Sequence, residues 1–174
     1  MSKFGAKSFL VYWGPVILWL GIIFLESVSV YASSDQTGQL LIPILHWLFP
    51  GLDSAQLTEF HHLIRKTGHL TGYGLLSYFL FRAWRGTHWI LRGTEDVIRR
   101  AHFWRPSWAL LALLGTAMVA SLDEMHQMTL PNRTGSWWDV LLDTFGGLVF
   151  QIAILLFIGM RTRSTRSIPE RVEA

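Results

Sequence analysis

The sequence contains no cysteine, and this absence excludes a disulfide framework, a thiolate zinc site and a cysteine nucleophile. Charge is also scarce: Asp, Glu, Lys and Arg make up 16% of the 174 residues, whereas about a quarter is usual in a soluble domain. Hydrophobic residues make up 51% of the chain. These proportions argue against a soluble globular enzyme and against a disordered chain. The length corresponds to a single domain.

The hydrophobic residues gather in four stretches with the composition of membrane spans. A hydrocarbon core of roughly 30 Å requires about 17 to 25 helical residues, and helix is the expected form because backbone groups in lipid must be satisfied within the segment. Three stretches contain long runs without charge. The second is apolar only over residues 67–81 and contains His69, so its basic flanks must snorkel to the interfaces. We predict spans at residues 8–25, 67–85, 106–124 and 139–160.

A fifth apolar stretch, residues 40–49, is too short to cross a bilayer. Pro43 interrupts it in the sequence and Pro50 ends it. We expect an interfacial or re-entrant segment here rather than a fifth span.

The positions of the basic residues predict the orientation. With the N-terminus in the cytoplasm, twelve of the fifteen Lys and Arg residues lie on the cytoplasmic side, as the positive-inside rule requires. The net charge of +3 is therefore a sign of topology and lipid contact, not of nucleic-acid binding. A cleavable signal peptide ending near Val30-Tyr31-Ala32 is the alternative for the first span. The length of the apolar run and the Glu26 that follows it favour a retained span.

Together these features predict an all-α integral membrane four-helix bundle. Both termini are cytoplasmic, and an outer interfacial, amphipathic segment lies between the first two spans. Residues 1–160 form one transmembrane domain, and residues 161–174 form a basic cytoplasmic tail.

Polar residues follow one face of the second span. His62, Lys66, His69, Tyr73 and Ser77 are spaced by three or four residues, which places them on one side of a helix. Such a stripe at membrane depth must face other helices or water. Helix-to-helix hydrogen bonding explains it as well as a substrate or proton site does.

Acidic residues gather where the third and fourth spans meet the outer side. Asp123 and Glu124 lie at the C-terminus of the third span, where the helix dipole disfavours negative charge. Ser136-x-x-Asp139 resembles a capping box at the start of the fourth span, but capping does not explain Asp143, one turn deeper. We expect these elements to converge in an outer polar cluster of Glu26, Lys66, His69, Tyr73, Asp123, Glu124, Gln127, Arg133, Asp139 and Asp143.

These residues give the chain a resemblance to the VanZ-like family over about residues 10–160. The motifs are Lys66-x-x-His69-x-x-x-Tyr73, Asp123-Glu124-Met125-His126-Gln127, Pro131-Asn132-Arg133 with Ser136, and Asp139 followed by Asp143 and Gly146-Gly147. Asp143 stands where such proteins often have Asn. The resemblance implies a small multi-pass protein of the bacterial cytoplasmic membrane, without a settled catalytic activity. The family's namesake is associated with low-level resistance to teicoplanin, a lipoglycopeptide antibiotic.

The first functional hypothesis is a non-catalytic envelope protein whose outer cluster binds a membrane lipid, a lipid-linked cell-wall intermediate or a lipoglycopeptide. The expected binding residues are Lys66, His69, Tyr73, Asp123, Glu124, Gln127, Arg133, Ser136, Asp139 and Asp143.

The alternative is a membrane enzyme acting on an envelope lipid or saccharide, with Asp123, Glu124, His69 and Tyr73 as candidate acid–base residues. A transporter is disfavoured because the acids lie at span ends rather than at the midplane. No cofactor is expected. No metal is expected either, because an Asp and a His three residues apart also form ordinary hydrogen bonds.

Overall fold

The computed structural model describes residues 6–29, 34–91, 104–130 and 135–166. Its regular elements are five helices, so the all-α prediction is confirmed: α1 (Ala6–Val28), α2 (Ser34–Leu48), α3 (Ser54–Leu91), α4 (Pro106–Gln127) and α5 (Trp137–Arg166). Three of them contain segments long and apolar enough to cross a membrane, at Ser8–Val28, Pro106–Gln127 and Trp137–Arg161. The predicted span at 67–85 lies within α3, which is not one of these three.

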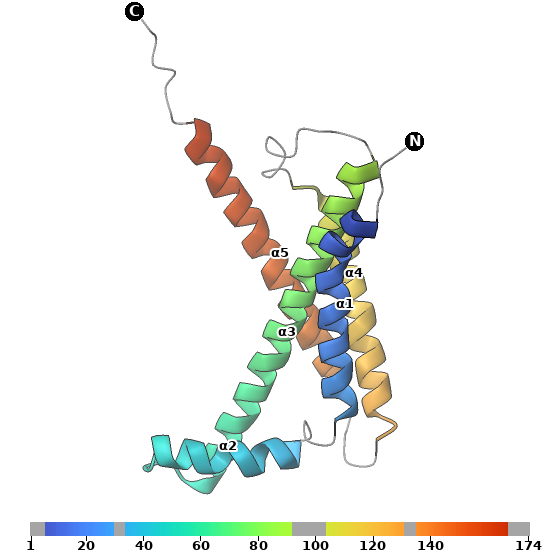
Figure 1. The fold of residues 1–174 in the computed structure, drawn as a ribbon. Helices are drawn as coiled ribbons and strands as arrows, with labels where there is room; N and C mark the ends of the chain where they lie inside the picture. Colours follow the sequence, from blue (N-terminus) through green and yellow to red (C-terminus); the bar gives the residue numbers. More distant parts are fainter. Residues whose placement is uncertain (1–5, 30–33, 92–103, 131–134, 167–174) are drawn as a thin grey trace, which may run out of the picture.

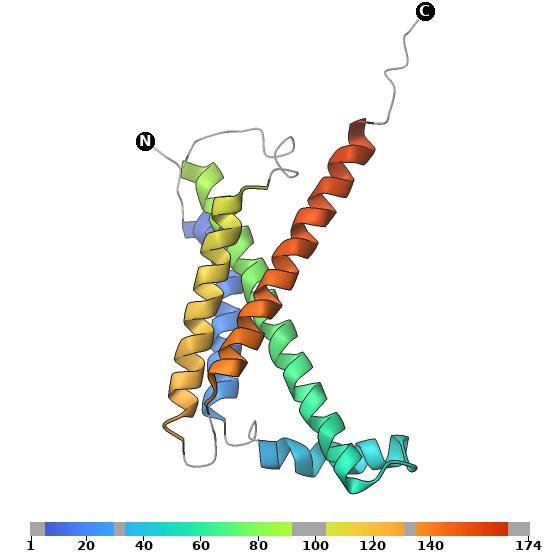
Figure 2. The same ribbon diagram turned by 180° about the vertical axis from the view of Figure 1, so that it is seen from behind.

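α3 is the longest helix and the centre of the assembly. Its 38 residues correspond to about 57 Å at 1.5 Å per residue, nearly twice the thickness of a hydrocarbon core. One half of α3 packs beside α1 and α4, and α5 crosses α3 like one arm of an X (Figure 1). The other half of α3 extends away from the crossing and carries α2, which lies across that end of the molecule (Figure 2).

The close approach of α3 and α5 depends on glycine. A Cβ added to Gly146 of α5 would collide with the backbone carbonyl of Leu70 in α3, and one added to Gly74 would enter the ring of Phe150. Small residues let helix backbones approach closely in membranes, where packing rather than hydrophobicity drives association. The core that results is formed by Val16, Tyr73, Leu76, Leu80, Phe81, Ala83, Trp108, Ala112, Ala120 and Val140.

The helix ends define two ends of the molecule. α2, the end of α1, the end of α4 and the start of α5 lie together, and we call this the cleft end. The start of α1, the end of α3, the start of α4 and the end of α5 lie together at the other, which we call the terminal end. This arrangement follows from the order of the helices along the chain.

One local expectation needs correction, and one helix extends further than expected. The helix α2 runs from Ser34 to Leu48 through Pro43, so this proline does not interrupt it; Pro43 removes only one helical hydrogen bond, to the carbonyl of the exposed Gln39. α5 continues to Arg166, so the segment expected as a tail from residue 161 begins as helix. Residues 167–174 lie outside the described residues.

Candidate functional site

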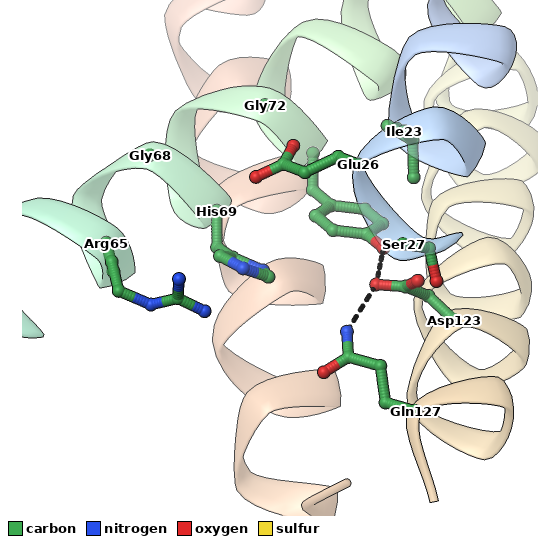
Figure 3. A pocket seen from close by; sticks show the side chains of 10 residues that line it. Ile23, Glu26, Ser27, Arg65, Gly68, His69, Gly72, Asp123 and Gln127 are labelled. Carbon is green, nitrogen blue, oxygen red and sulfur yellow. Dashed lines mark hydrogen bonds between the residues drawn. The ribbon is translucent and has the colours of Figure 1, made fainter. Parts of the chain in front are cut away.

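A polar cleft opens between α1, α3 and α4 at the cleft end. It contains about 400 Å³ of empty space, the open mouth included. Side chains of α3 and α4 converge on this space (Figure 3). We call it the outer-cluster cleft; its lining residues are Ile23, Glu26, Ser27, Arg65, Gly68, His69, Gly72, Tyr73, Asp123 and Gln127.

Asp123 forms the wall of the cleft on α4. Its Oδ2 accepts hydrogen bonds from the Tyr73 hydroxyl and the Gln127 side-chain amide, each at 3.0 Å. Its Oδ1 is buried and has no hydrogen-bond partner within the described residues. Buried polar atoms nearly always have a partner, so this oxygen has an unused capacity to accept a hydrogen bond.

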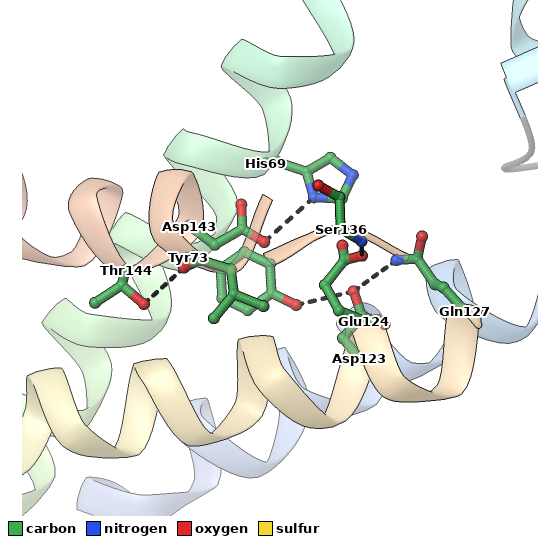
Figure 4. A network of polar contacts seen from close by, with 9 residues as sticks. His69, Tyr73, Asp123, Glu124, Gln127, Ser136, Asp143 and Thr144 are labelled. Carbon is green, nitrogen blue, oxygen red and sulfur yellow. Dashed lines mark hydrogen bonds and ion pairs between the residues drawn. The ribbon is translucent and has the colours of Figure 1, made fainter. Parts of the chain in front are cut away.

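His69 of α3, which lines the cleft, pairs with Asp143 of α5. Nδ1 of His69 lies 3.6 Å from Oδ2 of Asp143, which is completely buried (Figure 4). Neither carboxylate oxygen of Asp143 makes a hydrogen bond within the described residues. The glycine contact at Gly146, one turn deeper on α5, brings this carboxylate against α3. The His69 ring also stacks on Tyr73, with centroids 6.3 Å apart.

The cleft is held to its neighbours by further hydrogen bonds. The Ser27 hydroxyl lies 3.1 Å from Nδ1 of His126, which ties the end of α1 to α4. Arg65 donates from Nη1 to the Thr37 hydroxyl at 3.0 Å, which ties the mouth of the cleft to α2. The same hydroxyl lies 3.1 Å from Nε2 of the buried His61. The cleft therefore has connections to every helix that surrounds it.

Arg65, rather than Lys66, contributes the cation of α3 to the cleft. Lys66 is exposed and is not one of the lining residues. A step of four residues back from Tyr73 leads to His69, and four more lead to Arg65, on the same face of the helix. The three-residue step from His69 to Lys66 rotates the side chain away. The four-residue spacing Arg65–His69–Tyr73 is the signal in the sequence that makes Arg65 a candidate beside Lys66.

Glu124 lies outside the cleft and joins α4 to the start of α5. Its side chain is 3% exposed, and its Oε2 accepts a hydrogen bond from the backbone N–H of Ser136 at 2.8 Å. The Ser136 hydroxyl accepts one from the N–H of Trp138 at 3.2 Å, so Ser136 caps α5. In a full capping box Asp139 would take the Ser136 N–H, but Glu124 takes it instead. Asp139 is half-buried beside this turn.

Of the predicted cluster, the structure brings His69, Tyr73, Asp123, Gln127 and Asp143 together, with Glu26 at the opening. Arg133 lies outside the described residues. Within the part of the chain that the structure describes, no group of three or more His, Cys, Asp or Glu side chains is arranged to hold a metal ion.

A family model described as VanZ/LLP1 matches residues 10–158, which include every helix that lines the cleft. No curated protein and no solved structure matches the chain.

Proposed function

Because the chain belongs to the VanZ/LLP1 family, we propose that it is a multi-pass protein of the bacterial cytoplasmic membrane whose outer-cluster cleft binds the polar head group of an envelope amphiphile. The ligand would be a membrane lipid, a lipid-linked cell-wall intermediate or a lipoglycopeptide. Three helices able to cross a membrane support the membrane location.

The proposed topology has four spans, with the central part of α3 as the second. The start of α1 and the end of α5 both lie at the terminal end, which supports an even number of membrane crossings. The excess of basic residues on the terminal side supports a cytoplasmic location for that end. The cleft would then open outward, at the level of the lipid head groups.

The observation that carries the binding proposal is Oδ1 of Asp123, a buried carboxylate oxygen without a partner in the described residues. A sugar hydroxyl or an ammonium group can donate to it. Arg65 and His69 line the same cleft and can attract phosphate or carboxylate oxygens. A head group with donors and an anionic group, such as a sugar phosphate, matches both features.

The test uses Asp123→Asn in purified protein. Asn keeps an acceptor oxygen for Tyr73 and Gln127 but replaces the partnerless oxygen by a donor, so the fold should survive while binding is lost. Glu59→Gln is the matched control, since Glu59 is an exposed acid of α3 at the same end and outside the cleft. The probes are teicoplanin and a lipid-linked cell-wall disaccharide, titrated in detergent. Binding that both variants retain would refute the proposal.

A specific observation favours an enzyme as the second candidate. His69 faces the cleft with the buried Asp143 behind its Nδ1, and a histidine oriented by a carboxylate is a common general base. The acid–base role then belongs to His69 rather than to Glu124, whose carboxylate holds Ser136. Hydrolysis of an envelope lipid by purified protein, abolished in His69→Gln, would support this candidate. Absence of turnover across a lipid panel would exclude it for those substrates.

A further inference from the structure

A second hollow is lined by residues of α3 and α5. It lies on the other side of the helix crossing, where the two helices diverge toward the terminal end (Figure 1). It contains about 830 Å³ of empty space, the open side included. Aromatic and aliphatic side chains form most of it, and two arginines lie at its rim. We call it the divergence groove; it is lined by Tyr78, Phe81, Arg82, Arg85, Phe150, Ala153, Ile154, Phe157 and Ile158.

The two arginines are held in place by aromatic rings. The guanidinium carbon of Arg82 lies 5.6 Å from the centroid of the Tyr12 ring, and that of Arg85 lies 5.9 Å from that of Phe81. Both distances are within the usual range of cation–π contacts. Residues 60–91 and 144–166 contain no Asp or Glu, so α3 and α5 bring no acid to the groove. The rim therefore gains two cationic side chains, and no acid, from the described parts of α3 and α5 that line the groove.

The depth of the groove matches a lipid chain. From Arg85 back to Tyr78 is seven residues of α3, or about 10 Å along the helix, within the roughly 15 Å of one leaflet's hydrocarbon. Phe150 closes the groove near the helix crossing, where its ring covers Gly74. Charge lies at one end of the groove and apolar surface along the rest. A phospholipid has the same distribution.

We propose that the divergence groove is a binding site for an anionic glycerophospholipid of the leaflet at the terminal end. Its phosphate contacts Arg82 and Arg85, and one acyl chain lies along Phe150, Ile154 and Phe157. The positive charge of the two arginines favours an anionic lipid over a second copy of the chain as the occupant of the groove. A two-fold contact through this groove would bring the arginines of both copies together without a facing acid from α3 or α5.

The test is lipid retention by the full-length protein in mild detergent, measured by native mass spectrometry. Phosphatidylglycerol and phosphatidylcholine with the same acyl chains are the probes. Arg85→Gln is compared with Arg105→Gln, because Arg105 also lies at the terminal end over an aromatic ring, 5.5 Å from Trp108, but does not line the groove. Arg85→Lys keeps the charge and controls for loss of folding.

Phosphatidylglycerol should bind more tightly than phosphatidylcholine. Arg85→Gln should weaken its binding about fivefold, the equivalent of one basic residue near an anionic surface, while Arg105→Gln and Arg85→Lys should leave most of it. Equal retention of the two lipids, or equal weakening in Arg85→Gln and Arg105→Gln, would overturn the proposal.

A second measurement tests the other occupant. The chain has no cysteine, so Ala153→Cys places a single thiol in the groove. Efficient disulfide dimers whose yield phosphatidylglycerol does not lower would assign the groove to a second copy and overturn the proposal. Protection of this thiol from a maleimide by phosphatidylglycerol, but not by phosphatidylcholine, is the result we expect. Neither outcome depends on what the outer-cluster cleft binds.

Discussion

At the cleft end, Asp123 and Asp143 are enclosed between helices, and three of their four carboxylate oxygens have no hydrogen-bond partner within the described residues. At the terminal end, Arg82 and Arg85 lie at the rim of an open groove, supported by aromatic rings. The first arrangement is costly to stability, because a buried carboxylate loses its hydration. The second costs less, because both arginines are only half-buried and their guanidinium groups lie over aromatic rings. The comparison shows that folding alone accounts for the arginines but not for the enclosed acids.

The largest expected effect on stability comes from disturbing the close contact between α3 and α5 at Gly146, next to Asp143. In Gly146→Ala the new methyl group meets the backbone carbonyl of Leu70, which cannot move aside as a side chain can. We expect a loss of about 3 kcal/mol, at the upper end for overpacking, and a melting temperature lower by roughly 6–12 °C. Thermal unfolding in detergent measures this. Gly159→Ala, on the same helix, is the matched control: its new methyl group would have no neighbouring atom within 4 Å, so it should unfold at or above the wild-type temperature.

The next largest effect is expected at Glu124, which we regard as a structural residue, unlike the acids that line the cleft. Glu124→Ala removes the acceptor of the Ser136 N–H and should destabilise the protein by about 1.5–3 kcal/mol, as expected for a hydrogen bond to a charged group. Glu124→Gln keeps an acceptor oxygen and should lose much less. Both stabilities are read from chemical or thermal unfolding, and ligand binding should survive in Glu124→Gln. A catalytic or binding role for Glu124 would instead abolish function in the Gln variant while the fold stays intact.

Replacing the buried Asp143 should raise the stability rather than lower it. Asp143→Asn removes a buried carboxylate whose oxygens make no hydrogen bond within the described residues, so we expect the stability to rise by about 1 kcal/mol, the lower end of what an unsatisfied buried polar group costs. Arg85→Gln at the terminal end removes a half-buried cation over the Phe81 ring, so we expect it to lower the stability by about 0.5–1 kcal/mol. The two melting temperatures, measured side by side in the same detergent, test the comparison. A clear loss of stability in Asp143→Asn would mean that its pair with His69 holds the helices together.

Much of the fold could be predicted from the sequence, and the reason is the bilayer. Apolar runs of sufficient length identify α1, α4 and α5 because few other structures require them. The helical spacing of His69 and Tyr73 likewise predicted their shared face. Membership of the family followed from the motifs that surround these residues.

The remainder depends on contacts between distant segments. The role of Glu124 depends on a turn that brings Ser136 back to it, twelve residues later. Arg65 and Lys66 are adjacent, so their side chains point about 100° apart around the helix axis. Arg65 is the one directed toward α2, where it donates a hydrogen bond to Thr37. Periodicity narrows such a choice to one or two positions but does not show which partner faces them.

The smallest effect concerns the contact between α2 and α3, outside the spans. Burial lowers the pKa of His61, and the nearby Arg65 and His62 lower it further. The neutral ring is therefore the form that fits beside Thr37. Its contribution to stability is present above the ordinary value of about 6.5 and is lost as the pH falls through the lower pKa of the folded state. We expect α2 to loosen on acidification, as read from a fluorophore on Gln39→Cys, and His61→Gln to remove this pH dependence.

The most direct test of the account measures stability and binding together in Asp123→Asn. Thermal unfolding is followed with and without the lipid-linked disaccharide or teicoplanin. The account predicts a melting temperature equal to or above that of the wild type in the absence of ligand, and no increase when the ligand is added. A lower melting temperature with an undiminished ligand-induced increase would contradict it, because Asp123 would then be a structural residue and the cleft would not be the binding site.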